Sequence, residues 1–250
     1  MRKSYGVDLP ILLVSLIHEE IIWLKEFINT LNNITIMQPG YARIVYCPYC
    51  GEKKELLSLM SGNTIGARYW SDLRMRAPML PEVSPVQKCH HCGKYYLQYK
   101  QKTEHGEKPS LEQGELSYPE WKETYIQLMD ERGNSNPIQK VDEKDIDIIR
   151  LCLIQAYNDY YYRDCMAEFS EEESYYISNV IWDFVGSKNK PDNLHPLLIP
   201  ELLREIGMLC EDFFESECFE NLEGLDKIYY DGIRKRIEVD DTEVFELIIG

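Results

Sequence analysis

Two short cysteine turns are the residues of this chain best suited to do chemistry. They are Cys47-Pro48-Tyr49-Cys50-Gly51 and Cys89-His90-His91-Cys92-Gly93. Two intervening residues let a tight turn aim both sulfurs at one point, and the following glycine can take the positive φ needed to leave that turn. Four thiolates suit a tetrahedral, softly ligated metal ion. The turns therefore predict a metal site formed by Cys47, Cys50, Cys89 and Cys92, with zinc as the expected ion and iron as the alternative.

Other uses of these cysteines and histidines fit the pattern less well. A disulfide between cysteines three positions apart is strained, and idle thiols give no reason to repeat the flanking glycine. We expect His90 and His91 to face solvent, because the turn carries their rings outward. The 38 residues between Cys50 and Cys89 exceed the usual spacing of about 15–20 for paired sites. A long insertion must therefore loop out and return.

The two turns resemble those of zinc-ribbon and rubredoxin-like proteins, whose hallmark is a CPxCG knuckle on each of two β-hairpins. The resemblance covers about residues 41–100, and His90 stands in place of the second proline. With the segments 61–66 and 69–72, the chain also looks like uncharacterised bacterial proteins that have an N-terminal zinc ribbon and a helical, tetratricopeptide-like C-terminal half. The resemblance implies a fold and a metal, but no activity.

The insertion between the knuckles carries a candidate recognition surface. Its residues are Arg68, Tyr69, Trp70 and Asp72, on a predicted strand that ends in an exposed Asp72. In one interpretation they form a contact surface beside the metal. In the other, which we favour, Tyr69 and Trp70 cover the ribbon, because a small metal domain has little core of its own.

The second half of the chain has the capping residues and apolar periodicity of helices. Helices are predicted to start at Ser117 with Glu120 in a capping box, at Asp142, at Ser170, near Pro200, near Leu225, and at Asp240 or Asp241. Residues 201–207 resemble the first helix of a tetratricopeptide repeat, with Gly207 at a close helix crossing. The predicted fold class is α+β: a small β-rich zinc ribbon followed by an all-α, repeat-like domain of helical hairpins.

The predicted domain organisation has four parts. Residues 1–36 form an N-terminal helix or an upstream extension, with Met37 as the alternative natural start. Residues 37–100 form the zinc ribbon with its insertion, the polar, glycine-bearing segment 101–116 is a linker, and 117–250 is an acidic helical domain. The apolar run at 9–17 is too short to span a bilayer, so no membrane association is expected. The other cysteines, at positions 152, 165, 210 and 218, have no ligand spacing and predict core thiols in a reducing, cytoplasmic setting.

Charge is distributed unevenly along the chain. Residues 37–108 carry 11 basic and six acidic side chains, whereas residues 109–250 carry 13 basic and 33 acidic ones. A net charge of −20 on the second half opposes phosphate binding, so the pattern disfavours nucleic acid as a partner. No phosphate-binding loop and no hydrolase or metalloprotease motif is present. The sequence favours a protein-interaction scaffold with structural zinc, and the alternative is an enzyme or nucleic-acid-associated factor that uses the ribbon and its insertion.

Overall fold

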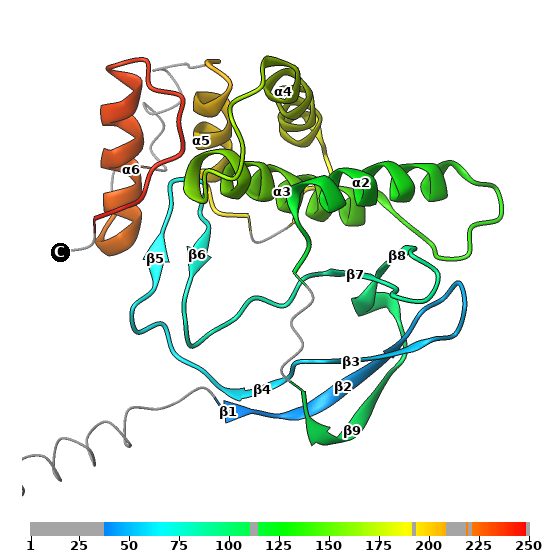
Figure 1. The fold of residues 1–250 in the computed structure, drawn as a ribbon. Helices are drawn as coiled ribbons and strands as arrows, with labels where there is room; N and C mark the ends of the chain where they lie inside the picture. Colours follow the sequence, from blue (N-terminus) through cyan, green and yellow to red (C-terminus); the bar gives the residue numbers. More distant parts are fainter. Residues whose placement is uncertain (1–37, 111–114, 192–193, 209–218, 220–221, 249–250) are drawn as a thin grey trace, which may run out of the picture.

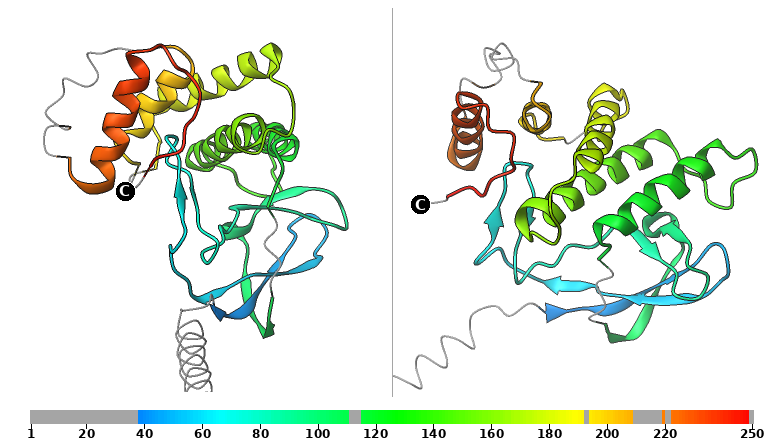
Figure 2. Two further views of the ribbon diagram at one scale, coloured as in Figure 1. Left: turned by 60° about the vertical axis from the view of Figure 1, so that its left-hand side comes forward. Right: turned by 45° about the horizontal axis from the view of Figure 1, so that its top comes forward.

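The chain folds into a layer of short strands and a layer of helices. The computed structural model describes residues 38–110, 115–191, 194–208, 219 and 222–248. Within these residues the antiparallel strands come first in the chain and the helices follow. Figure 1 shows the strands on one side and the helices on the other, and the two views in Figure 2 show the same division. The protein is therefore α+β, whereas the predictions for residues 1–36 and for Met37 as the start lie outside the described residues.

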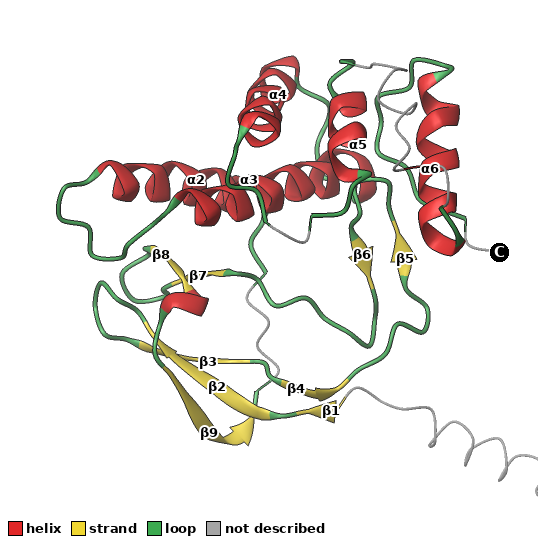
Figure 3. Cartoon of the chain, turned by 180° about the vertical axis from the view of Figure 1, so that it is seen from behind, coloured by secondary structure: helices red, strands yellow, loops and turns green. Residues whose placement is uncertain are grey.

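Four small antiparallel sheets make up the strand layer. The largest has β2 (Tyr41–Tyr46) between β3 (Lys53–Leu56) and β9 (Thr103–Pro109). The other sheets pair β1 (Gln38–Pro39) with β4 (Leu59–Ser61), β5 (Arg68–Tyr69) with β6 (Met75–Arg76), and β7 (Val86–Lys88) with β8 (Tyr95–Leu97). The long insertion between the knuckles thus contains β3, β4, β5, β6 and β7. Figure 3 shows its β5–β6 hairpin reaching from the strand layer towards α5 and α6.

The segment 101–116 is not simply a linker, because β9 occupies residues 103–109 and pairs with β2. Every residue of β9 except Gly106 is exposed. An edge strand that buries neither face needs no apolar alternation, so its polar sequence looks like a loop. Gly106 lies so close to β2 that an added Cβ would meet the Ala42 Cβ at 3.0 Å.

Five helices form the second layer in the described part of the chain. They are α2 (Tyr118–Gly133), α3 (Glu143–Asn158), α4 (Glu171–Gly186), α5 (Leu198–Glu205) and α6 (Gly224–Ile237). The predicted starts of the first three are confirmed: Ser117 and Glu120 form a capping box, Asp142 accepts from the Asp145 N–H, and Ser170 accepts from the Glu173 N–H. None of the described helices combines the length and the apolar character needed to cross a membrane.

Two expectations for the C-terminal region are wrong. No helix starts at Asp240 or Asp241; instead the segment runs back beside β5, where the Ser71 N–H donates to Phe245 and the Leu247 N–H donates to Tyr69. Gly207 does not mark a close helix crossing, since a Cβ there would meet no atom within 4 Å. Its φ of +67° and the bond from the Met208 N–H to the Leu203 carbonyl end α5 instead.

Strand β8 joins the two layers because both of its faces are buried. Tyr95 and Leu97 point into the core formed with the helices, whereas Tyr96 between them packs in a smaller core with Val45 and Leu56. Side chains of a strand alternate between its faces, so a three-residue strand can serve two cores. The strand layer and the helical layer therefore share buried contacts.

Helix α4 offers a direct test of the helical core. Replacing the fully buried Phe184 by alanine should lower the free energy of unfolding by about 3–5 kcal/mol, because it leaves a cavity among packed side chains. Replacing Tyr175, which lies on the opposite, exposed face of the same helix, should change it by less than about 0.5 kcal/mol. Urea unfolding of the two variants measures the difference; equal effects would contradict the placement of α4.

Candidate metal centre

Each cysteine turn forms the tip of a β-hairpin. The first turn connects β2 to β3, and the second connects β7 to β8. In the first, the Gly51 N–H donates to the Cys47 carbonyl at 2.9 Å, and in the second the Gly93 N–H donates to the Cys89 carbonyl at 2.8 Å. Gly51 and Gly93 have φ values of +75° and +72°. The predicted conformation of both turns, including the left-handed glycine, is confirmed.

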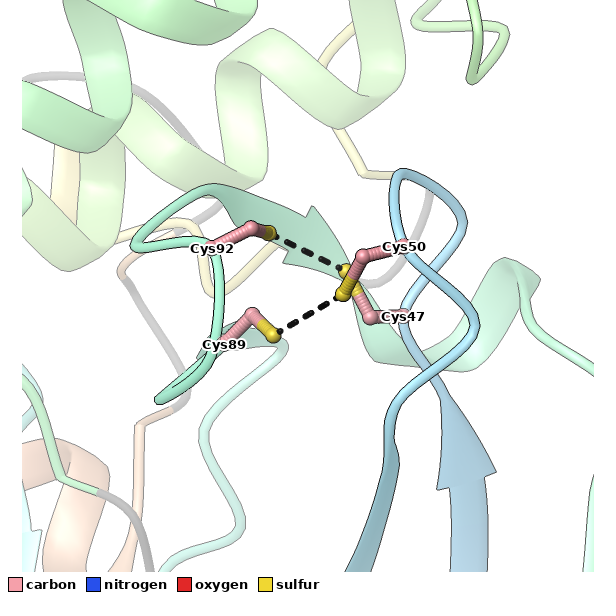
Figure 4. A group of neighbouring side chains, drawn as sticks. All are labelled: Cys47, Cys50, Cys89 and Cys92. Atoms are coloured by element: carbon pink, nitrogen blue, oxygen red, sulfur yellow. Dashed lines mark hydrogen bonds between the residues drawn. The ribbon is translucent and has the colours of Figure 1, made fainter.

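The two turns bring their four sulfurs together, as Figure 4 shows. All four sulfur atoms lie within 4.8 Å of one another. The Cys47 and Cys92 sulfurs are 3.7 Å apart, and those of Cys50 and Cys89 are 3.5 Å apart. Bonds of about 2.3 Å from a tetrahedral zinc separate sulfurs by about 3.8 Å, whereas a disulfide requires about 2.05 Å. The residues present therefore fit a single metal ion held by four cysteines.

Burial raises the pKa values of these thiols, and nearby backbone N–H groups lower them. Burial raises the pKa of Cys47 to about 12, although the Tyr49 N–H lowers it in part. At Cys89 burial also raises the pKa, but the N–H groups of Cys92 and His91 and the neighbouring thiols outweigh it and bring the value to about 7. N–H groups that point at sulfur favour the thiolate. A bound divalent cation requires all four groups to be deprotonated, so metal binding should weaken as the pH falls.

The two histidines of the second turn lie outside this cluster. His90 and His91 are both exposed, as predicted, and the His90 Nε2 lies 3.7 Å from a carboxylate oxygen of Glu52. Of the remaining cysteines, Cys152 is half-buried against the helical core, but Cys165 is exposed, so its prediction as a core residue is wrong. Cys210 and Cys218 lie outside the described residues.

Tyr49 connects the first turn to the helices, a role that sequence analysis missed. Its hydroxyl accepts hydrogen bonds from the Nε2 atoms of Gln127 at 3.1 Å and of Gln139 at 2.7 Å. Gln127 belongs to α2, and Gln139 precedes α3. The cysteine centre is therefore held against the helical layer by polar contacts.

The same two glutamines occupy the free edge of β8. The Tyr95 N–H donates to the Gln127 Oε1 at 3.1 Å, and the Gln127 Nε2 donates back to the Tyr95 carbonyl at 2.8 Å. The Leu97 N–H donates to the Gln139 Oε1 at 3.0 Å. A buried strand edge must satisfy its backbone groups, and here side-chain amides take the place of another strand. No local pattern distinguishes these glutamines from surface ones.

The candidate recognition residues do not form one exposed surface. Trp70 and Asp72 are buried, and the expectation of an exposed Asp72 is wrong. Tyr69 is half-buried, and Arg68 is exposed in an ion pair with Glu246. The β5–β6 hairpin inserts its tip among the helices, and Tyr69 packs against the cluster that contains Tyr229 and Ile233 of α6. The favoured expectation that Tyr69 covers the ribbon is therefore wrong.

Asp72 anchors a buried ion pair. Both of its carboxylate oxygens accept from the Arg163 Nη1 at 2.9 Å, and both side chains are 0% exposed. The Asn158 Nδ2 donates to Asp72 at 3.1 Å, and Arg163 also pairs with Asp159, four positions before it on the same helical turn. Residues 159–163 form a π-helical turn that extends α3. This network fixes the hairpin tip to the end of α3.

Comparison with known proteins leaves the site to be interpreted from its own geometry. No family model matches the chain, and no curated protein or solved structure matches it either.

Replacing one cysteine of each turn tests the centre. The Cys47→Ser/Cys92→Ser variant should lose its metal, from about one ion per chain to nearly none, because two of four donors are gone. Cys165→Ser, which removes an exposed thiol away from the cluster, should keep the wild-type content. Elemental analysis of the purified proteins measures this and distinguishes zinc from iron. Unchanged metal in the double variant would overturn the ligand assignment.

The buried and exposed ion pairs of the β5–β6 hairpin should respond differently to mutation. Asp72→Asn leaves Arg163 buried without its main counter-charge and should cost about 3–5 kcal/mol of unfolding free energy. Glu246→Gln removes the exposed pair with Arg68, whose side chain is 59% exposed, and should cost no more than about 1 kcal/mol. Denaturant unfolding of both variants measures the two losses of unfolding free energy. A larger loss in Glu246→Gln than in Asp72→Asn would refute this description.

Proposed function

We propose that this chain is a zinc-binding protein whose metal is structural and whose helical half is a scaffold for a protein partner. The observation that carries the structural role is the cysteine cluster, whose four sulfurs lie within 4.8 Å of one another and can supply all four ligands of a tetrahedral ion. Catalytic zinc sites keep a position for water or substrate, and structural sites do not. Zinc in preference to iron, a ribbon domain followed by repeat-like helical hairpins, and a cytoplasmic location are parts of this proposal.

The exposed face of α4 supports the choice of a protein as partner. Tyr175 is 73% exposed and Trp182 is 45% exposed, and their i, i+7 spacing places both on one face of the helix. Exposed tyrosine and tryptophan are the residues most enriched in binding hot spots. Glu171 and Glu172 lie exposed in the first turn of the same helix. Charge complementarity therefore favours a partner segment that carries basic side chains.

The alternative role, an enzyme or nucleic-acid-associated factor, has less support. It required Arg68, Tyr69, Trp70 and Asp72 to form a contact surface, and Trp70 and Asp72 are buried. The strongly negative second half of the chain also opposes phosphate binding.

Affinity capture with a matched pair of variants tests the scaffold. Tyr175→Ala/Trp182→Ala should lose a protein that the wild type captures, by at least roughly tenfold in recovered amount, since hot-spot truncation commonly costs 2 kcal/mol or more. Tyr41→Ala, which removes an exposed tyrosine from β2, should retain it. Quantitative mass spectrometry after nuclease treatment makes the comparison. The proposal would be contradicted if the α4 variant captured as much of that protein as the wild type does. It would also be contradicted if nuclease treatment abolished capture by the wild type.

A further inference from the structure

A cavity of about 800 Å³ lies where the insertion meets α2 and α3. One wall is apolar and includes Ala77, Leu80, Cys152 and Ala156. The lining also holds charged residues, called the charged wall below: Arg74, Arg76, Glu82, Asp159 and Asp164. Pockets of about 300–1,000 Å³ with apolar walls and a few convergent polar groups are typical of small-molecule sites. The cavity is separate from both the cysteine cluster and the exposed face of α4.

The backbone beside this cavity is strained. Leu73, next to Arg74, has a φ of +62°, and Cys165, next to Asp164, has a φ of +47°. Asp159, in the charged wall, begins the π-helical turn 159–163. Left-handed non-glycine residues cost about 1–3 kcal/mol each, and such residues and π-turns concentrate at functional sites. The described chain has only one other non-glycine residue with positive φ, Asp240.

The arginines in the charged wall already have carboxylate partners. Arg76 donates to both oxygens of Asp164, at 2.8 and 2.9 Å, and lies 2.9 Å from Asp159. Arg74 reaches Glu82 at 2.5 Å and Asp159 at 3.4 Å. An anionic ligand would have to displace these carboxylates, at a cost in lost charge-assisted hydrogen bonds.

Carboxylates outnumber the arginines available within the cavity. The exposed Glu82 and Glu115 line it together with Asp159 and Asp164. Arg163, outside the lining, also pairs with Asp159, whereas the third arginine of the lining, Arg68, pairs with Glu246 outside the cavity. The Glu82 side chain is 44% exposed, and its partial burial raises its pKa. The charges of Asp159 and Glu115 add to that effect in spite of Arg74. Negative charge therefore accumulates around Glu82, where a bound cation would relieve the repulsion.

We infer that this cavity binds a small organic cation, an amine, amidine or guanidine carried on an apolar skeleton. Glu82 and Glu115 face the cationic group, and the wall formed by Ala77, Leu80 and Ala156 contacts the skeleton. Both carboxylates are exposed, so water screens each attraction in part, and the preference for a cation comes from several carboxylates acting together.

Three probes of similar shape and different charge test the ligand class. We expect the benzamidinium cation to bind at least roughly tenfold more tightly than neutral benzamide or the benzoate anion, a difference of about 1.4 kcal/mol. Ligand-detected NMR titration of the full chain measures the three dissociation constants. Equal binding of all three probes, a preference for benzoate, or no benzamidine binding at millimolar concentration would overturn the inference.

Variants locate the binding on the molecule. Glu82→Gln and Glu115→Gln should each weaken benzamidine binding several-fold, because each removes a carboxylate facing the cation. Glu238→Gln changes an exposed carboxylate just after α6, outside the cavity, and should leave binding unchanged. Circular dichroism verifies that all three variants fold. Benzamidine binding that is unaltered in both Glu82→Gln and Glu115→Gln would also overturn the inference.

Discussion

The meeting of two cysteine turns is the constraint on which the strand layer depends. Residues 47–51 and 89–93 are far apart in the chain, yet their sulfurs lie within 4.8 Å of one another. Everything between Gly51 and Cys89 must therefore leave one turn and return to the other. The chain uses this excursion to build β3 beside β2 and β4 beside β1, and then to send the β5–β6 hairpin into the helical layer. A metal ion held by both turns would close this long loop. Its binding free energy would offset the entropy that the chain loses when the loop closes on folding.

The strand layer depends on the helices for much of its burial and hydrogen bonding. Tyr95 and Leu97 of β8 pack into the helical core, and Gln127 and Gln139 complete the hydrogen bonds of the strand edge. A layer of such short strands has too little apolar surface to fold on its own. The cysteine centre and the helical layer consequently support each other, and Tyr49, inside the first turn, makes this link within the centre itself.

Charge has different roles in different parts of the molecule. The pair of Asp72 and Arg163 is fully buried, and its value lies in fixing where the hairpin tip meets α3. Around the cavity, carboxylates engage Arg74 and Arg76 and leave an excess of negative charge. On the outer face of α4, acidic residues surround exposed aromatic side chains. Part of the negative charge of the second half, at Asp159 and Asp164, is thus engaged in ion pairs with arginines of the first half.

The sequence alone determined the features that depend on neighbouring residues. The CxxC-G spacing predicted both turns and their left-handed glycines, and the side chains of Ser117, Asp142 and Ser170 predicted where helices begin. Hydrogen bonds within a few residues decide such features, so local sequence is sufficient.

Only the tertiary structure decided the features that depend on distant partners. The polar strand β9 exists because β2 offers it an edge, and Asp72 is buried because Arg163, 91 positions away, neutralises it. The C-terminal segment is extended rather than helical because Ser71 and Tyr69 supply its hydrogen bonds. In each case an interaction between residues distant in the sequence outweighs the local conformational preference. No pattern of neighbouring residues predicts that interaction.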